Sequence, residues 1–190
     1  MEAIKMGNQQ ATDLEIGWMA GVLDGEGSIS MRAWPYKGKI HFVVSVSVSN
    51  TSRELLTKFS DICSKLGVNL HWISKSVPSG DLPGWDIETK KISHCARILR
   101  STIANLTSKQ ERASLVLSFC ERRLAFAKEC VENGTDISKK YPYNDDDWAF
   151  FREFAERFHH KTKTVTSTTI PMGVGLKGAR SAGQAKSLMI

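Results

Sequence analysis

Residues 19–27 read M-A-G-V-L-D-G-E-G, a stretch that begins with the periodicity of a helix and ends in glycines. The residues before it complete this helix, which we predict over residues 13–24 with Asp13 as its N-cap. Glu26 follows at the carboxyl end of the helix, where the helix dipole disfavours an anion. A carboxylate at this position needs water or a cation as its partner, so Glu26 is a candidate ligand for a metal ion.

Three glycines share one stripe of the predicted helix. Gly17, Gly21 and Gly25 recur every fourth residue, with Ala20 beside them. Each glycine costs about 1 kcal/mol of helix stability relative to alanine, and the close approach of a second backbone would offset that cost. If the same helix of a second copy packs here, two Glu26 carboxylates and nearby carbonyls form a hard-oxygen site suited to Mg²⁺.

The stretch of residues 19–27 resembles the nine-residue signature of the LAGLIDADG homing endonucleases. Its direct matches to the signature are Ala20, Gly21, Asp24 and Gly27. The resemblance covers about residues 12–165 and implies an α+β domain with an αββαββα core and extra C-terminal helices. It further implies a site-specific double-strand DNA endonuclease that hydrolyses phosphodiester bonds with Mg²⁺, for which Mn²⁺ can substitute, at a long pseudo-palindromic site.

The chain carries one copy of this signature, so the resemblance implies a two-fold homodimer through the signature helix. The interface residues that it implies are Gly17, Ala20, Gly21, Asp24 and Gly25. Each subunit of such a dimer would contact one half of the DNA site.

The remaining patterns fit the same core. In chain order we predict strands over 28–34 and 42–49, a helix over 52–67, strands over 70–76 and 85–91, and helices over 94–104, over 108–131 and from 144 onward. The acidic triplet 145–147 opens the last helix, where it complements the helix dipole; a metal cluster is the alternative. We expect residues 1–165 to form the domain and residues 166–190 to form a flexible basic tail.

Residues 42–49 alternate apolar side chains with polar ones, which predicts a strand with one face on the core and one facing water. The polar faces of the four strands could contact base edges in the major groove of DNA, and a merely solvated face is the alternative. The candidate DNA-binding residues are Ser30, Arg32, Ser45, Ser47, Asp86, Glu88 and Lys90 from the strands, with Lys161 and Lys163 as phosphate contacts.

The resemblance also implies the catalytic residues. Residues 109–117 are similar to a family segment that begins with a catalytic-pocket lysine, so Lys109 takes that place and would stabilise developing negative charge. Asn50 matches a position that orders water, after a one-residue adjustment. Glu26 from each subunit would hold the metal, with the Gly25 carbonyl as an additional ligand.

Composition agrees with a nucleic-acid partner. Lys and Arg outnumber Asp and Glu by 26 to 20, which gives a formal net charge of +6 and suits double-stranded DNA. No run approaches the roughly 20 apolar residues of a membrane span, and the N-terminus lacks a signal sequence. We therefore expect no membrane partner and an intracellular, DNA-containing compartment: the cytoplasm of a prokaryote, or an organelle such as a mitochondrion or chloroplast. The 4 cysteines form no C-x-x-C pair and are expected to be buried thiols.

A second interpretation is a non-cleaving nucleic-acid binder on the same scaffold, such as a maturase that helps an intron RNA to fold. The presence of Glu26, Lys109 and Asn50 favours cleavage, because a binder has no need for an acid at the end of this helix. Intron RNA nevertheless stays open as an additional partner, since RNA binding and DNA cleavage can coexist in one chain.

Overall fold

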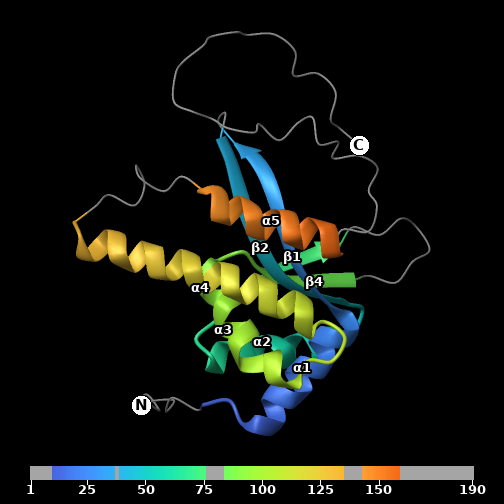
Figure 1. Ribbon diagram of the computed structural model, residues 1–190. Helices are drawn as coiled ribbons and strands as arrows, with labels where there is room; N and C mark the ends of the chain where they lie inside the picture. Colours follow the sequence, from blue (N-terminus) through green and yellow to red (C-terminus); the bar gives the residue numbers. More distant parts are fainter. Residues whose placement is uncertain (1–9, 37–38, 76–83, 135–142, 159–190) are drawn as a thin grey trace. The chain divides into compact units, whose positions relative to one another are not determined.

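The computed structural model describes residues 10–36, 39–75, 84–134 and 143–158. In chain order its elements are α1 (Asp13–Glu26), β1 (Gly27–Tyr36), β2 (Lys39–Asn50), α2 (Arg53–Lys65), β3 (His71–Lys75), β4 (Gly84–Thr89), α3 (Ile92–Thr102), the 3-10 helix η1 (Ile103–Asn105), α4 (Gln110–Glu132) and α5 (Asp145–Phe158) (Figure 1). This order confirms the predicted αββαββα core with further helices. The predicted tail at 166–190, together with Lys161 and Lys163, lies outside the described residues.

The strands form one antiparallel sheet in the order β1-β2-β4-β3. Strand β2 is the long central element, and its alternation confirms the prediction for residues 42–49. Four of its side chains are buried: Phe42, Val44, Val46 and Val48. The intervening serines are only partly buried, so they occupy the opposite face.

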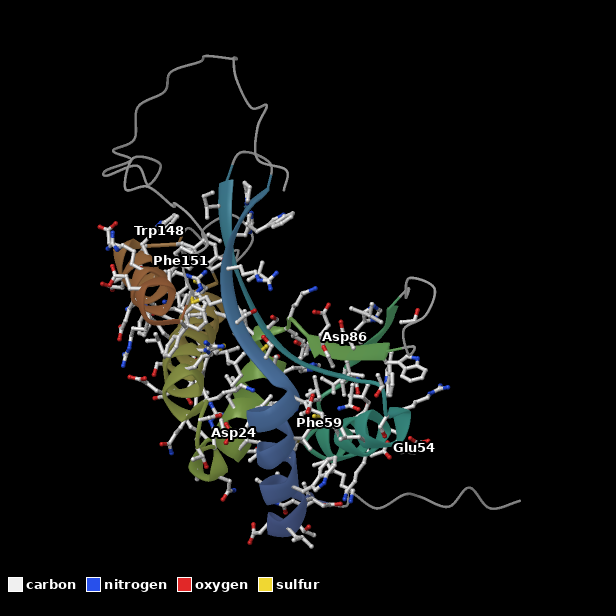
Figure 2. The ribbon with its side chains drawn as sticks, turned by 90° about the vertical axis from the view of Figure 1, so that its right-hand side faces the viewer. Asp24, Glu54, Phe59, Asp86, Trp148 and Phe151 are labelled. Carbon is white, nitrogen blue, oxygen red and sulfur yellow. The ribbon has the colours of Figure 1, made fainter. Side chains whose placement is uncertain are left out.

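All the helices cover the same face of the sheet. Phe59 of α2 is buried in the core beneath this face, whereas Asp86 of β4 lies on the opposite side, as Figure 2 shows. Helix α5 covers the β1–β2 hairpin (Figure 1) through aromatic contacts with Phe42. The Phe42 ring centroid lies 4.8 Å from that of Trp148 and 5.1 Å from that of Phe151, both labelled in Figure 2. The other face of the sheet is therefore left without a helix in the described part of the chain.

Several boundaries differ from the sequence predictions. The N-cap of α1 is Thr12 and not Asp13, because Thr12 and Glu15 form a capping box: the Thr12 hydroxyl accepts from the Glu15 N–H, and a Glu15 carboxylate oxygen accepts from the Thr12 N–H. Helix α3 begins two residues earlier than predicted, at Ile92. All four cysteines are buried and free, as predicted. None of the described helices is both long and apolar enough to span a lipid bilayer.

A buried ion pair joins α5 to α4. The Arg123 guanidinium lies 2.7 Å from the Asp147 carboxylate, and both side chains are almost completely buried. Asp147 also belongs to a cap at the start of α5: its carboxylate accepts the Asn144 N–H, while its own N–H donates to the Asn144 side chain. The acidic first turn of α5 is thus used for capping and ion pairing, and no group of three or more His, Cys, Asp or Glu side chains that could hold a metal occurs among the described residues.

Replacing Asp147 by alanine should lower the free energy of unfolding by about 3–5 kcal/mol, because it leaves the buried Arg123 without its carboxylate. The matched control is Asp145→Ala, which removes an exposed carboxylate from the same turn. Urea titrations followed by circular dichroism would measure both variants. Equal midpoints for the two variants would contradict this role of Asp147.

Candidate active site and nucleic-acid interface

The C-terminus of α1 is closed by a lysine from a distant part of the chain. The Lys109 ammonium donates hydrogen bonds to the carbonyl oxygens of Leu23 (2.8 Å), Asp24 (2.6 Å) and Gly27 (2.7 Å). The last carbonyls of a helix have no partner within the helix, and α1 has no basic residue in its own last turn. Lys109 therefore supplies both the missing donors and the positive charge that favours a helix C-terminus.

The N-terminus of α4 is closed in return by an aspartate of α1. The Asp24 carboxylate accepts the backbone N–H groups of Thr107 (2.6 Å), Ser108 (3.3 Å) and Lys109 (3.0 Å), and also the Ser108 hydroxyl (3.1 Å). The N-cap residue of α4, Lys109, makes no side-chain cap of its own. Figure 2 shows Asp24 on the side of α1 toward the chain that enters α4. The two helix ends thus cap each other.

Glycine is required where α1 passes into β1. A Cβ on Gly27 would lie 2.6 Å from the Leu23 carbonyl oxygen and would also overlap the Leu23 side chain. The same Gly27 N–H donates to the Leu23 carbonyl, so the backbone approaches the last turn of the helix closely. This contact fixes the direction in which β1 leaves α1.

The pKa values at this junction follow from its hydrogen bonds. Burial raises the pKa of the Asp24 carboxyl, but the backbone N–H groups of Thr107 and Lys109, together with Ser108, outweigh it and hold the pKa below its usual range. Burial lowers the pKa of the Lys109 ammonium, and the nearby carboxylates of Asp24 and Glu26 offset this only in part. Glu26 is thus close enough to the ammonium for their charges to interact.

Glu26 is the last residue of α1, and its side chain is exposed. Its carboxylate and the Gly25 carbonyl are both hard oxygen donors, and neither belongs to the set that Lys109 binds. The chemistry of these donors fits Mg²⁺, but two oxygens are fewer than the six ligands of an octahedral Mg²⁺ ion. Water or a second copy of this helix end would have to supply the others.

Asn50 lies near the same end of the molecule. It is the last residue of β2, two positions beyond Val48, which pairs with Gly27. Its side-chain oxygen accepts the Ser52 N–H at 2.8 Å, and the Ser52 hydroxyl caps α2 by accepting the Leu55 N–H at 3.2 Å. In the free chain Asn50 therefore stabilises the turn into α2, while its amide NH₂ can donate to another group.

A groove of about 490 Å³ runs over the helix-free face of the sheet. It contains all seven strand residues predicted to bind DNA: Ser30, Arg32, Ser45, Ser47, Asp86, Glu88 and Lys90. It also contains three residues that the sequence prediction missed, namely Ser28, Trp34 and Val43. Their alternation with the buried residues of β1 and β2 was the available signal for them.

The groove mixes both charges with hydroxyl groups. The Ser30 and Ser45 hydroxyls hydrogen-bond each other across the strands at 2.7 Å, and either can be the donor. The Lys90 ammonium pairs with the Glu88 carboxylate, and Lys90 remains more than half exposed. Such a set of donors and acceptors can match the edges of bases.

The glycine stripe of α1 faces away from the core. A Cβ on Gly17, Gly21 or Gly25 would meet nothing within 4 Å, and Leu14 at the start of the same helix is 85% exposed. Ala20, beside this stripe, is fully buried in the core of its own chain. The Asp24 carboxylate is also held within its own chain, as described above. Ala20 and Asp24 thus already have contacts within their own chain, and the interface of Gly17, Ala20, Gly21, Asp24 and Gly25 stays a prediction.

No protein-family model and no curated protein matches the sequence. Solved structures do match the fold. The group I intron-encoded homing endonuclease I-CeuI, complexed with DNA, has a TM-score of 0.55 at 11% identity, with 82% of this chain and 72% of that chain covered. The meganuclease I-SmaMI, bound to uncleaveable DNA, has a TM-score of 0.53 at 12% identity, with 74% and 43% covered.

A third similar structure is the LAGLIDADG homing endonuclease I-GzeII in complex with its DNA target, with a TM-score of 0.50 at 12% identity. The match covers 73% of this chain and 42% of that chain. The chain therefore has the fold of the LAGLIDADG homing endonucleases. This is the fold that the resemblance of residues 19–27 predicted.

Replacing Asp24 by asparagine should lower the free energy of unfolding by about 1–2 kcal/mol at pH 7, because the charge is lost and an NH₂ donor replaces one of the two accepting oxygens. The folded pKa of Asp24 is depressed, so its contribution is present above the unfolded pKa of about 3.9 and disappears as pH falls through the folded pKa.

The difference between wild type and Asp24→Asn should accordingly shrink as the pH is lowered from neutral into this acidic range. Chemical unfolding across pH measures it, with Asp61→Asn at an exposed site of α2 as the control. A difference that stays constant with pH would argue against the charged cap.

Proposed function

We propose that the protein is a site-specific DNA endonuclease that hydrolyses one phosphodiester bond in each strand of a long DNA site. One observation carries this proposal: β1 runs without interruption from the acid–lysine junction at Glu26 into the polar groove. A candidate hydrolytic site and a candidate DNA-reading surface are therefore continuous parts of one element. A formal net charge of +6 agrees with a polyanionic substrate.

The fold supports this proposal by analogy. I-CeuI, I-SmaMI and I-GzeII share the fold and are all homing endonucleases or meganucleases bound to DNA in their structures. The chemistry of the proposed activity depends on the residues at the end of α1. A sheet with one face free of helices, as found here, can lie in a major groove.

We assign the metal to the end of α1. Glu26 and the Gly25 carbonyl would bind Mg²⁺, with Mn²⁺ as a substitute, and a second copy would contribute the same two oxygens. A bound metal would neutralise negative charge on the phosphate oxygens and would lower the pKa of a bound water molecule. The Lys109 ammonium, near Glu26 and already positively charged, would stabilise negative charge that develops on the phosphate. Asn50 would orient water through its amide NH₂.

We further propose that the protein acts as a homodimer through α1. The face of α1 that contains Leu14, Gly17 and Gly21 points away from the core, and its residues are apolar or small. This face can therefore approach a second helix closely, as faces rich in glycine do. A second α1 would bring two Glu26 residues together and would place two polar grooves across a two-fold site.

Gly21→Leu should convert the dimer into a monomer. A side chain at this position meets nothing within 4 Å in one chain, so the fold itself should tolerate it, and leucine is the better helix former. Sedimentation velocity would report the change, with Ser114→Leu on the exposed side of α4 as the control. If the Gly21→Leu protein sediments like wild type, the proposal that α1 forms the dimer interface is wrong.

Glu26→Gln should abolish cleavage while DNA binding is retained, because the amide keeps the shape but loses the charge that attracts the metal. The test incubates wild type and variant in Mg²⁺ with a plasmid library of randomised inserts, and sequences the DNA ends. Discrete double-strand ends from wild type alone support the endonuclease and define its site. Equal cutting by both proteins would exclude Glu26 from the metal site. If both proteins bind DNA or an intron RNA without cutting, the protein is a non-cleaving binder and the endonuclease proposal is wrong.

A further inference from the structure

Two apolar side chains interrupt the polar groove. Trp34 of β1 is 61% exposed, which makes it the most exposed aromatic residue in the described part of the chain. Val43 of β2 lines the same groove and is partly buried. Val43 pairs with Arg32 and Trp34 pairs with His41, so Val43 and Trp34 are diagonal neighbours on one face. Together they form an apolar patch within a surface of hydroxyl and charged groups.

Core packing does not explain the position of Trp34. The core side of β1 carries Ile29 and Met31, both fully buried, and α5 covers that side of the hairpin through Phe42. Trp34 alternates with these residues and therefore faces the groove, where no described helix covers it. The exposed indole beside Val43 therefore offers a contiguous apolar surface to a partner.

The spacing of the strand fits the spacing of DNA. Side chains on one face of a strand recur about every 6.7 Å, which is about twice the 3.4 Å rise per base pair. Ser28, Ser30, Arg32 and Trp34 therefore advance by about two base pairs each. Trp34 comes eight residues after Glu26, roughly 26 Å along the strand, which corresponds to about eight base pairs from the cleavage centre.

One group on the base edges of the major groove is apolar, and that is the 5-methyl of thymine. Given that the protein binds DNA as proposed above, we propose that Trp34 and Val43 select thymine through this methyl group at the outer end of each half-site. Arg32, directly opposite Val43 and one step nearer the centre than Trp34, would contact a more polar base pair, and the serines would contact the innermost pairs. The outer positions are thus read by apolar contact and the inner positions by hydrogen bonds.

The test separates the methyl group from the rest of the base. Two pools of the same randomised duplexes are synthesised, one with thymine and one with uracil, which lacks only the methyl. Wild type should bind the selected thymine duplex about fourfold more tightly than its uracil counterpart for each methyl contacted. Single thymine-to-uracil changes should locate the effect about six to eight base pairs from the centre and nowhere else.

Trp34→Ala and Val43→Ala should each reduce this preference toward equal binding of the two duplexes. Neither variant removes a phosphate contact, so the salt dependence of binding should stay that of wild type. Ile40→Ala is the matched control, because Ile40 lies at the same hairpin end but on the opposite face. Val43→Ala keeps the test decisive if the tryptophan variant misfolds.

Three results would overturn the inference while leaving DNA binding intact. The first is a wild type that binds thymine and uracil duplexes equally at every position. The second is a preference that both variants retain. The third is a Trp34→Ala protein that loses affinity equally for both pools, which would indicate stacking or backbone contact instead of methyl recognition. A wild type that binds neither pool would refute the proposed function itself.

Discussion

The structure depends on a reciprocal cap between two helices that are more than 80 residues apart in the chain. Lys109 satisfies the carbonyls at the end of α1, and Asp24 satisfies the N–H groups at the start of α4. Each charge is favourable at the dipole end that it occupies. Because β1 leaves α1 at the same point, this one junction orients the helix, the acid Glu26 and the first strand of the groove together.

Much of the fold could be predicted because its signals are local. The alternation in β2 and the glycines of residues 19–27 are patterns that can be recognised within a few residues. The order of elements predicted from such patterns was correct. The cap at Thr12 was missed by one residue, since only the geometry of the Glu15 side chain distinguishes it from Asp13. The partners of Asp24 could not be predicted, because no local pattern links a carboxylate to N–H groups 83 residues away.

The candidate site was predictable in part for the same reason. The seven strand residues predicted to bind DNA all line one groove. Successive side chains of a strand alternate between the two faces of the sheet, so the sequence position is enough to predict the face. Trp34 and Val43 were left out because only polar side chains were considered as contacts to base edges, although their alternation along the strands placed them in the groove. Lys109 was found through the family resemblance, but its three carbonyl partners give it a structural role that resemblance does not reveal.

The alternation along β2 has an evolutionary consequence. Its apolar side chains support the core, while Ser45 and Ser47 on the other face contribute little to it. Substitutions in the groove can therefore accumulate with little effect on folding, so this face can change its pattern of donors and acceptors while the scaffold persists. The Ser30–Ser45 hydroxyl pair adds to this tolerance, because either oxygen can donate or accept a hydrogen bond.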